Sequence, residues 1–401
     1  MIRVNNIHLS LDYDDKSVRK AVAQQLRIEE KSIKSCKIFR RSVDARKKDN
    51  IYFLTTVDAE LNINEDKVCK KCGNAQIARK YEYNQMKFGN APSPIVVGAG
   101  PAGLFAALIL ARSGANPILI ERGRDVDRRT ADVNRFWTSG KLDITSNVQF
   151  GEGGAGTFSD GKLNSGTKDI RQRKVLEEFV SHGAPDEILY NAKPHIGTDM
   201  LKGTIKNIRN EIIELGGRVM FETKLVSMAF SDNKLKSITV ETANGDEIIE
   251  TDNVILAIGH SARDTFEMLY DLKLPIEAKP FSVGARIEHL RQKVDKAQYG
   301  RFAGNKKLGS ANYKLSTHLD NGRGVYTFCM CPGGKVVNAS SEENRLCTNG
   351  MSEFARDADN SNSALLVGIN PDDYESDHPL AGMYLQRKLE SKAFVAGGEN
   401  Y

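Results

Sequence analysis

Three closely spaced glycines, Gly98, Gly100 and Gly103, form the most chemically informative segment of the chain. They follow the β-branched run 95–97 and precede a run of apolar helix formers over 102–112, so they fall where a strand hands over to a helix. Gly98 permits a tight turn, Gly100 leaves room for a pyrophosphate, and Gly103 lets the helix pack closely on the strand. The unpaired N–H groups of the first helical turn would then face phosphate oxygens.

A carboxylate completes this pattern. The apolar run 118–120 predicts the next strand, and Glu121 follows at its carboxyl end, eighteen residues after Gly103. A carboxylate at this position accepts hydrogen bonds from the hydroxyls of an adenosine ribose and repels a 2′-phosphate. The segment therefore predicts a dinucleotide site for FAD or NAD rather than NADP, with further cofactor contacts expected at Pro101, Ala102 and Arg122.

A second glycine-rich segment covers residues 149–164. It has no convincing strand before it and no helix after it, so it is not a second dinucleotide fingerprint. It predicts a loop whose backbone approaches something flat or anionic, and a flexible surface loop is the alternative. The candidate cofactor contacts in it are Gly153, Gly154, Gly156 and Lys162.

The composition indicates a globular protein of more than one domain. The chain has 401 residues, of which 40% are hydrophobic and 27% charged, and two or three domains are natural for that length. No apolar run approaches the length of a membrane span and no signal peptide is visible, so we expect a cytoplasmic protein without a membrane partner. Six cysteines are too sparse for a disulfide scaffold and are interpreted as reduced thiols.

Residues 1–88 form the first expected domain, a small basic α+β module. The block 2–11, the helix-like run 17–26 and the strand-like run 51–57 together suggest this module. Lys and Arg are densest over 34–48. Nucleic-acid binding is one interpretation of that run, but a solvated basic face is favoured because no aromatic stacking platform or known binding motif accompanies it.

Residues 89–275 form the second expected domain, around the dinucleotide site. Runs at 224–231, 234–242 and 247–250 predict a β-meander, because turn residues separate them. The apolar strand 254–259 then ends at Gly259, which places backbone at the carboxyl edge of the sheet where ligands bind in doubly wound folds. Gly259 is therefore another candidate cofactor contact, and a helix is expected over 265–271.

Residues 276–401 form the third expected domain, an α+β unit on the substrate side. Strands are expected at 281–287, 324–330 and 365–369, and a polar loop at 349–362. Cys329 and Cys331 would share one face of a strand. They are either a redox pair facing a cofactor or packed core cysteines, with the second favoured.

Side-chain chemistry elsewhere is sparse. The seven histidines show no metal-binding spacing, so no metal site is expected. Cys69 and Cys72 form the only CxxC, which could be half of a zinc site, a redox dithiol or two plain thiols, the last being favoured. No catalytic residue is assigned.

The order of these features resembles the two-dinucleotide-binding-domain flavoproteins. Ile258 stands where that superfamily usually has Thr before the strand's closing glycine. Longer phrases are similar to a bacterial family of uncharacterised FAD-dependent dehydrogenases, and this likeness covers nearly the whole chain. It implies an α/β fold with a Rossmann-like FAD/NAD(P)-binding domain and β-meander, and FAD as cofactor. The phrases lie at 150–163, 193–198, 259–264, 279–284 and 326–334.

One departure from the superfamily pattern bears on cofactor binding. A late Gly-Asp motif normally closes the FAD domain, and none follows residue 260 here. We therefore expect the chain to be C-terminally truncated relative to that pattern, with one side of the cofactor uncovered and flavin binding weak or absent.

The resemblance implies an FAD-dependent oxidoreductase (dehydrogenase) that transfers hydride between an unknown small-molecule substrate, or a reduced nicotinamide, and bound flavin. With no second glycine fingerprint, NAD(P)H is expected only as a transient electron donor. The alternative is a flavin- or nucleotide-binding regulatory protein whose basic module contacts RNA or another acidic partner.

Overall fold

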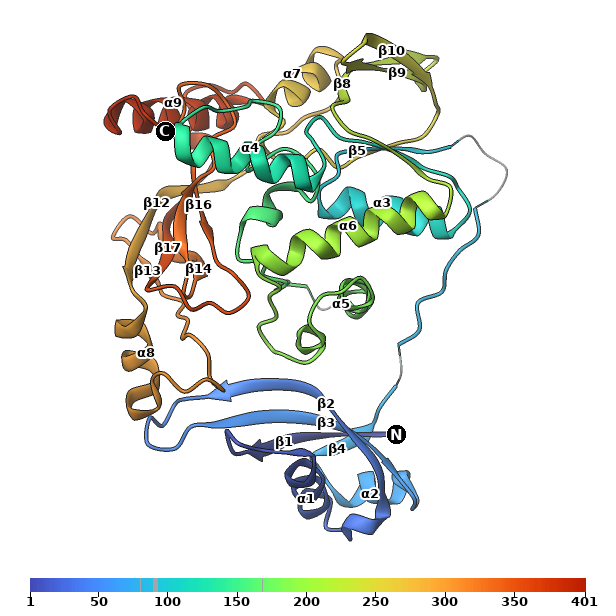
Figure 1. Cartoon of the computed structure of the whole chain (residues 1–401), viewed down its shortest axis with the longest axis vertical. Helices are drawn as coiled ribbons and strands as arrows, with labels where there is room; N and C mark the ends of the chain where they lie inside the picture. The colour runs from blue at the N-terminus through green and yellow to red at the C-terminus, as the bar shows by residue number, and fades with distance from the viewer. Residues whose placement is uncertain (80, 89–92, 168) are drawn as a thin grey trace.

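The computed structural model describes residues 1–79, 81–88, 93–167 and 169–401. Its N-terminal module is an antiparallel sheet with strand order β2-β3-β1-β4, drawn at the bottom of Figure 1. Every second residue of β3 from Phe53 to Ala59 is buried, as expected for a strand with one face on a core. The elements are β1 (Ile2–Leu9), α1 (Asp15–Leu26), β2 (Ile33–Asp44), β3 (Tyr52–Leu61), α2 (Glu65–Lys71) and β4 (Ala75–Ile77).

The basic run of the module lies mainly on β2, and part of it is already paired. Arg41 donates to Asn191 Oδ1 at 2.8 and 3.1 Å and to the Tyr13 hydroxyl at 3.0 Å. Its backbone N–H also donates to the Tyr190 carbonyl at 2.7 Å. Arg46, two residues beyond the end of β2, pairs with Asp44, the last residue of that strand. The contacts of Arg41 with Tyr190 and Asn191 therefore join the module to the second domain.

A four-stranded parallel sheet, with order β11-β5-β6-β7, forms the centre of the second domain. The helices α3 and α6 pack together on one face of this sheet. Their buried apolar side chains, such as Leu104 of α3 and Ile212 of α6, belong to one hydrophobic core. This βαβ arrangement is the Rossmann-like fold that the sequence predicts. The elements are β5 (Ile95–Val97), α3 (Pro101–Arg112), β6 (Ile118–Ile120), α6 (Thr198–Glu214), β7 (Arg218–Met220) and β11 (Val254–Leu256).

The expected β-meander covers the other face of this sheet. Its order is β10-β9-β8, and its apolar side chains share a core with the parallel strands and with α7. The elements are β8 (Lys224–Ser231), β9 (Lys234–Thr242), β10 (Gly245–Glu250) and α7 (Arg263–Asp271). The connections between β6 and α6 hold α4 (Val126–Ser139), α5 (Gln172–Ser181) and the short 3₁₀ turns η2 (Gly154–Phe158) and η3 (Asp186–Leu189).

A second antiparallel sheet, with order β12-β17-β14-β13, forms the C-terminal part together with the β15-β16 hairpin. In Figure 1 this sheet stands beside the parallel-sheet domain. No helix of the described segments is both long and apolar enough to cross a membrane. The elements are β12 (Phe281–Leu290), α8 (Arg291–Tyr299), β13 (Ser316–His318), β14 (Gly324–Cys331), β15 (Lys335–Asn338), β16 (Thr348–Met351), β17 (Asn360–Ile369) and α9 (Ala381–Ala396), with 3₁₀ turns at Glu30–Ser32, Gly300–Phe302 and Pro371–Asp373.

The expected polar loop over 349–362 is wrong at both ends. Residues 349–351 belong to β16, and β17 begins at Asn360. Ser361, Asn362 and Ser363 are fully buried in β17. Polar side chains were read as loop formers, but here they take hydrogen bonds inside the sheet, such as that from Arg286 to Asn362 Oδ1 at 2.5 Å.

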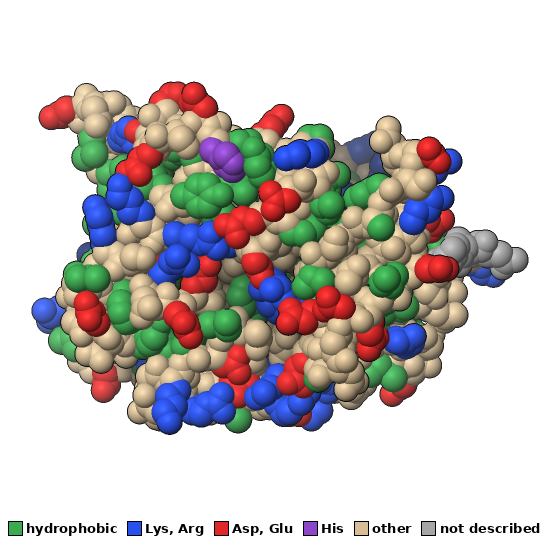
Figure 2. Space-filling model, turned by 90° about the horizontal axis from the view of Figure 1, so that it is seen from above, with side chains coloured by type: hydrophobic (Ala, Val, Ile, Leu, Met, Phe, Trp, Pro, Cys, Tyr) green, Lys and Arg blue, Asp and Glu red, His purple; other side chains and the backbone are tan. Residues whose placement is uncertain are grey.

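An ionic cluster attaches α9 to α7. Arg263, at the start of α7, is only 6% exposed and pairs with Glu342 and with Glu390 of α9. Arg387 of α9 pairs in turn with Glu342 at 2.7 Å and with Glu267 at 2.5 Å. Figure 2, which looks onto the end of the molecule that carries α7 and α9, shows acidic and basic side chains interleaved. Because these charges are largely buried and mutually paired, each depends on the others.

Replacing Arg263 tests this attachment. We expect Arg263→Ala to lower the free energy of unfolding by about 3 kcal/mol, because it leaves buried carboxylates without their partner. Urea titration followed by circular dichroism measures the change. The control is Lys388→Ala in α9, which removes an exposed pair with Glu375 and should cost less than about 1 kcal/mol. Equal losses in the two variants would contradict the structural role of the cluster.

Candidate functional site

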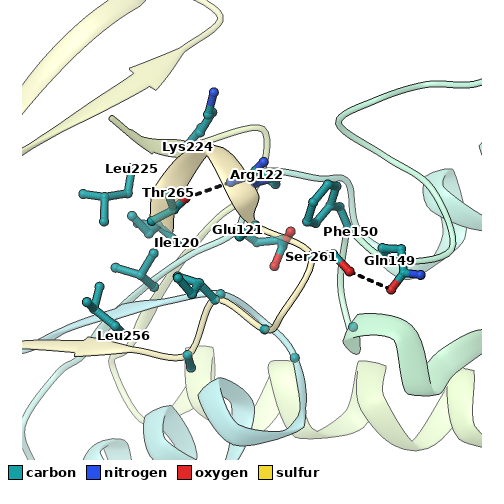
Figure 3. Close-up of a pocket in the computed structure, with 18 of the residues that line it drawn as sticks. Ile120, Glu121, Arg122, Gln149, Phe150, Lys224, Leu225, Leu256, Ser261 and Thr265 are labelled. Carbon is teal, nitrogen blue, oxygen red and sulfur yellow. Dashed lines mark hydrogen bonds between the residues drawn. The ribbon is translucent and has the colours of Figure 1, made fainter. Parts of the chain in front are cut away.

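A cavity of about 660 Å³ opens at the carboxyl ends of β5, β6 and β11. Figure 3 shows side chains from four separate segments around it. It is the place where a doubly wound sheet binds its ligand. Its walls include Gly98, Gly100, Pro101, Ala102, Glu121, Arg122, Phe150, Gly154, Ala155, Leu256, Ile258, Gly259 and Thr265.

The glycines of the β5–α3 turn have separate steric roles. Gly98 has φ +101°, a left-handed conformation that other residues rarely adopt. A Cβ on Gly103 would lie 1.8 Å from the Gly98 carbonyl oxygen, so only glycine lets α3 approach β5 this closely. Gly100 faces Gly154, where a Cβ would lie 3.1 Å from the Gly100 Cα. Two glycines therefore keep open the gap into which the first turn of α3 points its N–H groups.

Glu121 holds the two glycine segments together. Its Oε2 accepts from the Ala99 N–H at 2.7 Å, and its Oε1 accepts from the N–H groups of Gly123 at 2.9 Å and Gly151 at 3.0 Å. The side chain is buried but lines the cavity. A carboxylate has about four acceptor positions, so one remains for a ribose hydroxyl. The sequence indicated the ribose role and missed the backbone contacts.

Arg129 of α4 fixes the backbone of the second glycine segment by hydrogen bonds to its carbonyl groups. It is fully buried, and its five N–H groups donate to five backbone carbonyls. Burial lowers its pKa to about 10, which leaves it charged at neutral pH. Nothing in the sequence signals this role, because the partners are carbonyl groups that any residue supplies. They belong to Asn147, Val148, Gly151, Glu152 and Gly154.

Glu152 attaches the same segment to its neighbours. Its Oε2 accepts from the Val126 N–H at 2.7 Å and from Arg209 of α6 at 2.9 Å. Burial raises the pKa of Glu152 above its ordinary value. The expected loop is therefore held by α4 and α6 and is not a flexible surface loop.

Arg122 forms part of the cavity wall. Its guanidinium lies 4.4 Å from the centre of the Phe150 ring and donates to Asp264 at 2.9 Å and Thr265 at 3.0 Å. Burial opposes ionisation of Asp264, but Arg122 and Lys224 lower the pKa of Asp264 to about 2. Arg122 thus lies in the wall of the cavity and is already paired with α7.

The structure separates the predicted contacts into two groups. Eight of them line the cavity: Gly98, Gly100, Pro101, Ala102, Glu121, Arg122, Gly154 and Gly259. The other four do not. Gly103 packs helix on strand, Gly153 packs against Ile205, and Gly156 has open space beside it. Lys162 instead pairs with Asp160 at 2.8 Å.

The remaining candidates for chemistry are the cysteines and histidines. No group of three or more His, Cys, Asp or Glu among the described residues is placed to hold a metal ion. Cys69 is half-buried, and burial together with nearby acidic residues raises its pKa. Cys329 and Cys331 both lie next to Lys162.

Gly103→Ala tests the glycine cradle, that is, the β5–α3 turn of residues 98–103. The added methyl would meet the Gly98 carbonyl and force α3 outward, so we expect a stability loss of about 2–3 kcal/mol and FAD affinity reduced about tenfold or more. Flavin fluorescence titration measures the affinity. The control is Gly203→Ala in α6, which has nothing within 4 Å of its Cβ and should gain up to about 1 kcal/mol. Wild-type FAD affinity in Gly103→Ala would refute the steric argument.

Arg129→Met tests the buried guanidinium. Five carbonyls would lose their donor, so we expect the free energy of unfolding to fall by about 3–5 kcal/mol and proteolysis to begin within 147–154. Urea titration and mass spectrometry of limited digests give the two readouts. Arg135→Met, on the exposed side of the same helix, should cost less than about 1 kcal/mol. An intact 147–154 segment in Arg129→Met would count against the assignment.

Solved structures similar to this chain include several flavoproteins. A glycerol-3-phosphate dehydrogenase from Bacillus halodurans complexed with FAD has a TM-score of 0.35 and 13% identity, over 78% of this chain and 53% of that one. The flavin-dependent brominase Bmp2 triple mutant has a TM-score of 0.36 and 13% identity, over 76% and 64%. These likenesses are too distant to support a functional argument.

Family models match three parts of the chain. An FAD binding domain matches residues 93–132, which contain the glycine cradle and Glu121. The C-terminal domain-like model of FAD-dependent proteins matches 280–401, and a domain of unknown function matches 1–60. The facing glycines, the helix N-terminus and the cavity fit this cofactor, as described above. FAD is therefore the cofactor of this chain.

One relative is similar to this chain along the whole of its length. An uncharacterised protein of Clostridium beijerinckii is 48% identical over 406 residues, which is 100% of this chain and 75% of that protein. The chain therefore belongs to the same family as that protein, a family of FAD-dependent proteins.

Proposed function

We propose that the chain is an oxidoreductase in which a small-molecule substrate, or a reduced nicotinamide, exchanges hydride with bound FAD. The observation that carries this proposal is that the second glycine segment, residues 149–164, contacts both the dinucleotide cavity and the C-terminal sheet. Gly154 and Ala155 line the dinucleotide cavity. Four residues on, Ser159 donates to the Gly350 carbonyl of β16 at 3.2 Å. A reactant held at the C-terminal sheet would therefore lie next to the cofactor's cradle.

The protein's own groups have binding and shielding roles in this proposal. The first turn of α3 holds the pyrophosphate, and Glu121 holds the adenosine ribose. Phe150, Leu256 and Ile258 give the cavity apolar walls that exclude water. When bound, FAD supplies the hydride chemistry itself, so no side-chain nucleophile is required.

In this proposal NAD(P)H binds transiently, donates its hydride and dissociates. Residues 151–156 repeat the glycine spacing of 98–103, but only the short 3₁₀ turn η2 accompanies them, whereas 98–103 connects β5 to α3. We therefore assign FAD to the fingerprint at 98–103 and no second dinucleotide to 151–156. This supports a short encounter with NAD(P)H rather than a dedicated second dinucleotide domain.

Anaerobic reduction tests the proposal. The chain is saturated with FAD, and loss of the flavin absorbance bands is followed in a stopped-flow instrument after NADH or NADPH is added. We expect bleaching that slows when the transferred hydrogen of the nicotinamide is deuterium, because the C–H bond breaks in the measured step. A panel of small-molecule alcohols, amines and hydroxy acids replaces the nicotinamide in parallel runs.

Two results would overturn the proposal. A protein that binds no FAD even at high concentration would remove its basis. Bound FAD that dithionite reduces, but no nicotinamide or small molecule in the panel does, would favour a regulatory flavoprotein instead.

A further inference from the structure

Two cysteines of β14 lie beside one lysine. The Lys162 ammonium nitrogen is 3.4 Å from the Cys331 sulfur and 3.9 Å from the Cys329 sulfur. Cys331 is fully buried, whereas Cys329 is partly exposed. One cation therefore contacts two sulfurs, one on a fully buried residue and one on a partly exposed residue.

The backbone of β14 brings these two side chains together. The register against β17 shifts between Phe328 and Cys331, and Cys329 has φ +46°. A regular strand separates residues i and i+2 by nearly 7 Å, the upper limit for a disulfide. The left-handed residue interrupts that extension, and the Cys331 sulfur lies 3.4 Å from the Cys329 carbonyl oxygen. The bulge thus folds Cys331 back toward Cys329.

The surrounding groups leave space and positive charge at the pair. A Cβ on Gly350 would lie 2.8 Å from the Cys331 sulfur, so β16 approaches the thiol only because it carries glycine there. Arg286 of β12 donates to the Cys329 carbonyl at 3.3 and 3.4 Å. Asp160 holds Lys162 in place and is itself paired with Arg356.

The two sulfurs are electrostatically unequal. A hydrogen bond from the Cys331 thiol, helped by the charges of Lys162 and Arg286, lowers the pKa of Cys329 to about 5 against the opposing effect of burial. The same hydrogen bond and burial raise the pKa of Cys331. Cys329 is therefore the sulfur that ionises more readily, and Cys331 is the one that keeps its proton.

We propose that Cys329 and Cys331 are a redox-active dithiol that exchanges with low-molecular-weight disulfides. The Cys329 thiolate attacks one sulfur of the disulfide, the S–S bond breaks, and a mixed disulfide forms. The departing thiolate takes the proton of Cys331. The Cys331 thiolate then attacks the Cys329 sulfur and releases the second half of the disulfide as a thiolate. In total the protein gives up two electrons and one proton, and the disulfide becomes one thiol and one thiolate, which takes its proton from water.

Peptide mass spectrometry tests the exchange on the full chain. The reduced protein is incubated with glutathione disulfide, free thiols are blocked with N-ethylmaleimide, and trypsin releases both cysteines in the single peptide 324–335. We expect that peptide to lose two hydrogen atoms and carry no maleimide. In Cys331→Ser the reaction should stop with one glutathione on Cys329, and in Cys329→Ser it should leave Cys331 unmodified. The peptide that carries Cys36 should remain fully blocked by maleimide.

The rate of alkylation provides a second test that needs no disulfide. At pH 5.5 iodoacetamide should modify Cys329 about tenfold faster than Cys36, after allowance for the weaker nucleophilicity of a low-pKa thiolate. Between pH 6 and 8 the Cys329 rate should stay nearly constant, while that of Cys36 rises steeply. Lys162→Gln should restore a pH-dependent rate at Cys329.

The proposal fails if wild-type peptide 324–335 carries two maleimides after glutathione disulfide treatment. It also fails if glutathione is found on Cys331 rather than Cys329, or if Cys329 and Cys36 show the same pH profile. These readouts follow sulfur and need no flavin, so they are independent of the proposed hydride transfer.

Discussion

The buried guanidinium of Arg129 is the constraint on which the site depends. A charge of this kind is tolerable without water only if all of its N–H groups are satisfied, and here five backbone carbonyls satisfy them. Those carbonyls come from one stretch of eight residues, 147–154, so satisfying the charge fixes the path of that stretch. The carboxylates of Glu121 and Glu152 offset part of the cost of burial. The glycines in this stretch do not make it flexible, because the charge inside it permits only one path.

With that path fixed, the second glycine segment contacts the dinucleotide cavity on one side and the C-terminal part of the protein on the other. Its first half closes the cavity, because Glu121 accepts from Gly151 and Gly154 faces Gly100. Beyond residue 154, the second glycine segment meets the connection between β16 and β17 through Asp160, which pairs with Arg356 and accepts from Ser352. The dinucleotide cradle and the C-terminal sheet are thus held in register by one buried charge and one buried carboxylate.

The sequence predicted those parts whose local pattern is unambiguous. The strand 95–97, the helix that follows it, Glu121 and the meander are present as expected, because apolar periodicity and turn residues specify them locally. The role of Arg129 was invisible, since its partners are backbone carbonyls. The bulge at Cys329 was missed for a similar reason: a regular strand was assumed, and the register shift depends on pairing with a distant strand. The polar start of β17 was read as a loop because burial of Ser361 and Asn362 depends on partners elsewhere in the chain.

The sequence Cys329-Met330-Cys331 also gives the N-terminal module a structural connection to the site. Met330 is buried in the same core as Val4, Val57 and the helix α8 residue Val294. Its two neighbours instead contact Lys162 of the second glycine segment. Anchoring Met330 in the module's core fixes the point at which β14 bulges, and the bulge determines how the two sulfurs meet the lysine. The module, whose basic run was interpreted from the sequence chiefly as a solvated face, therefore positions a strand of the C-terminal sheet against the glycine segment.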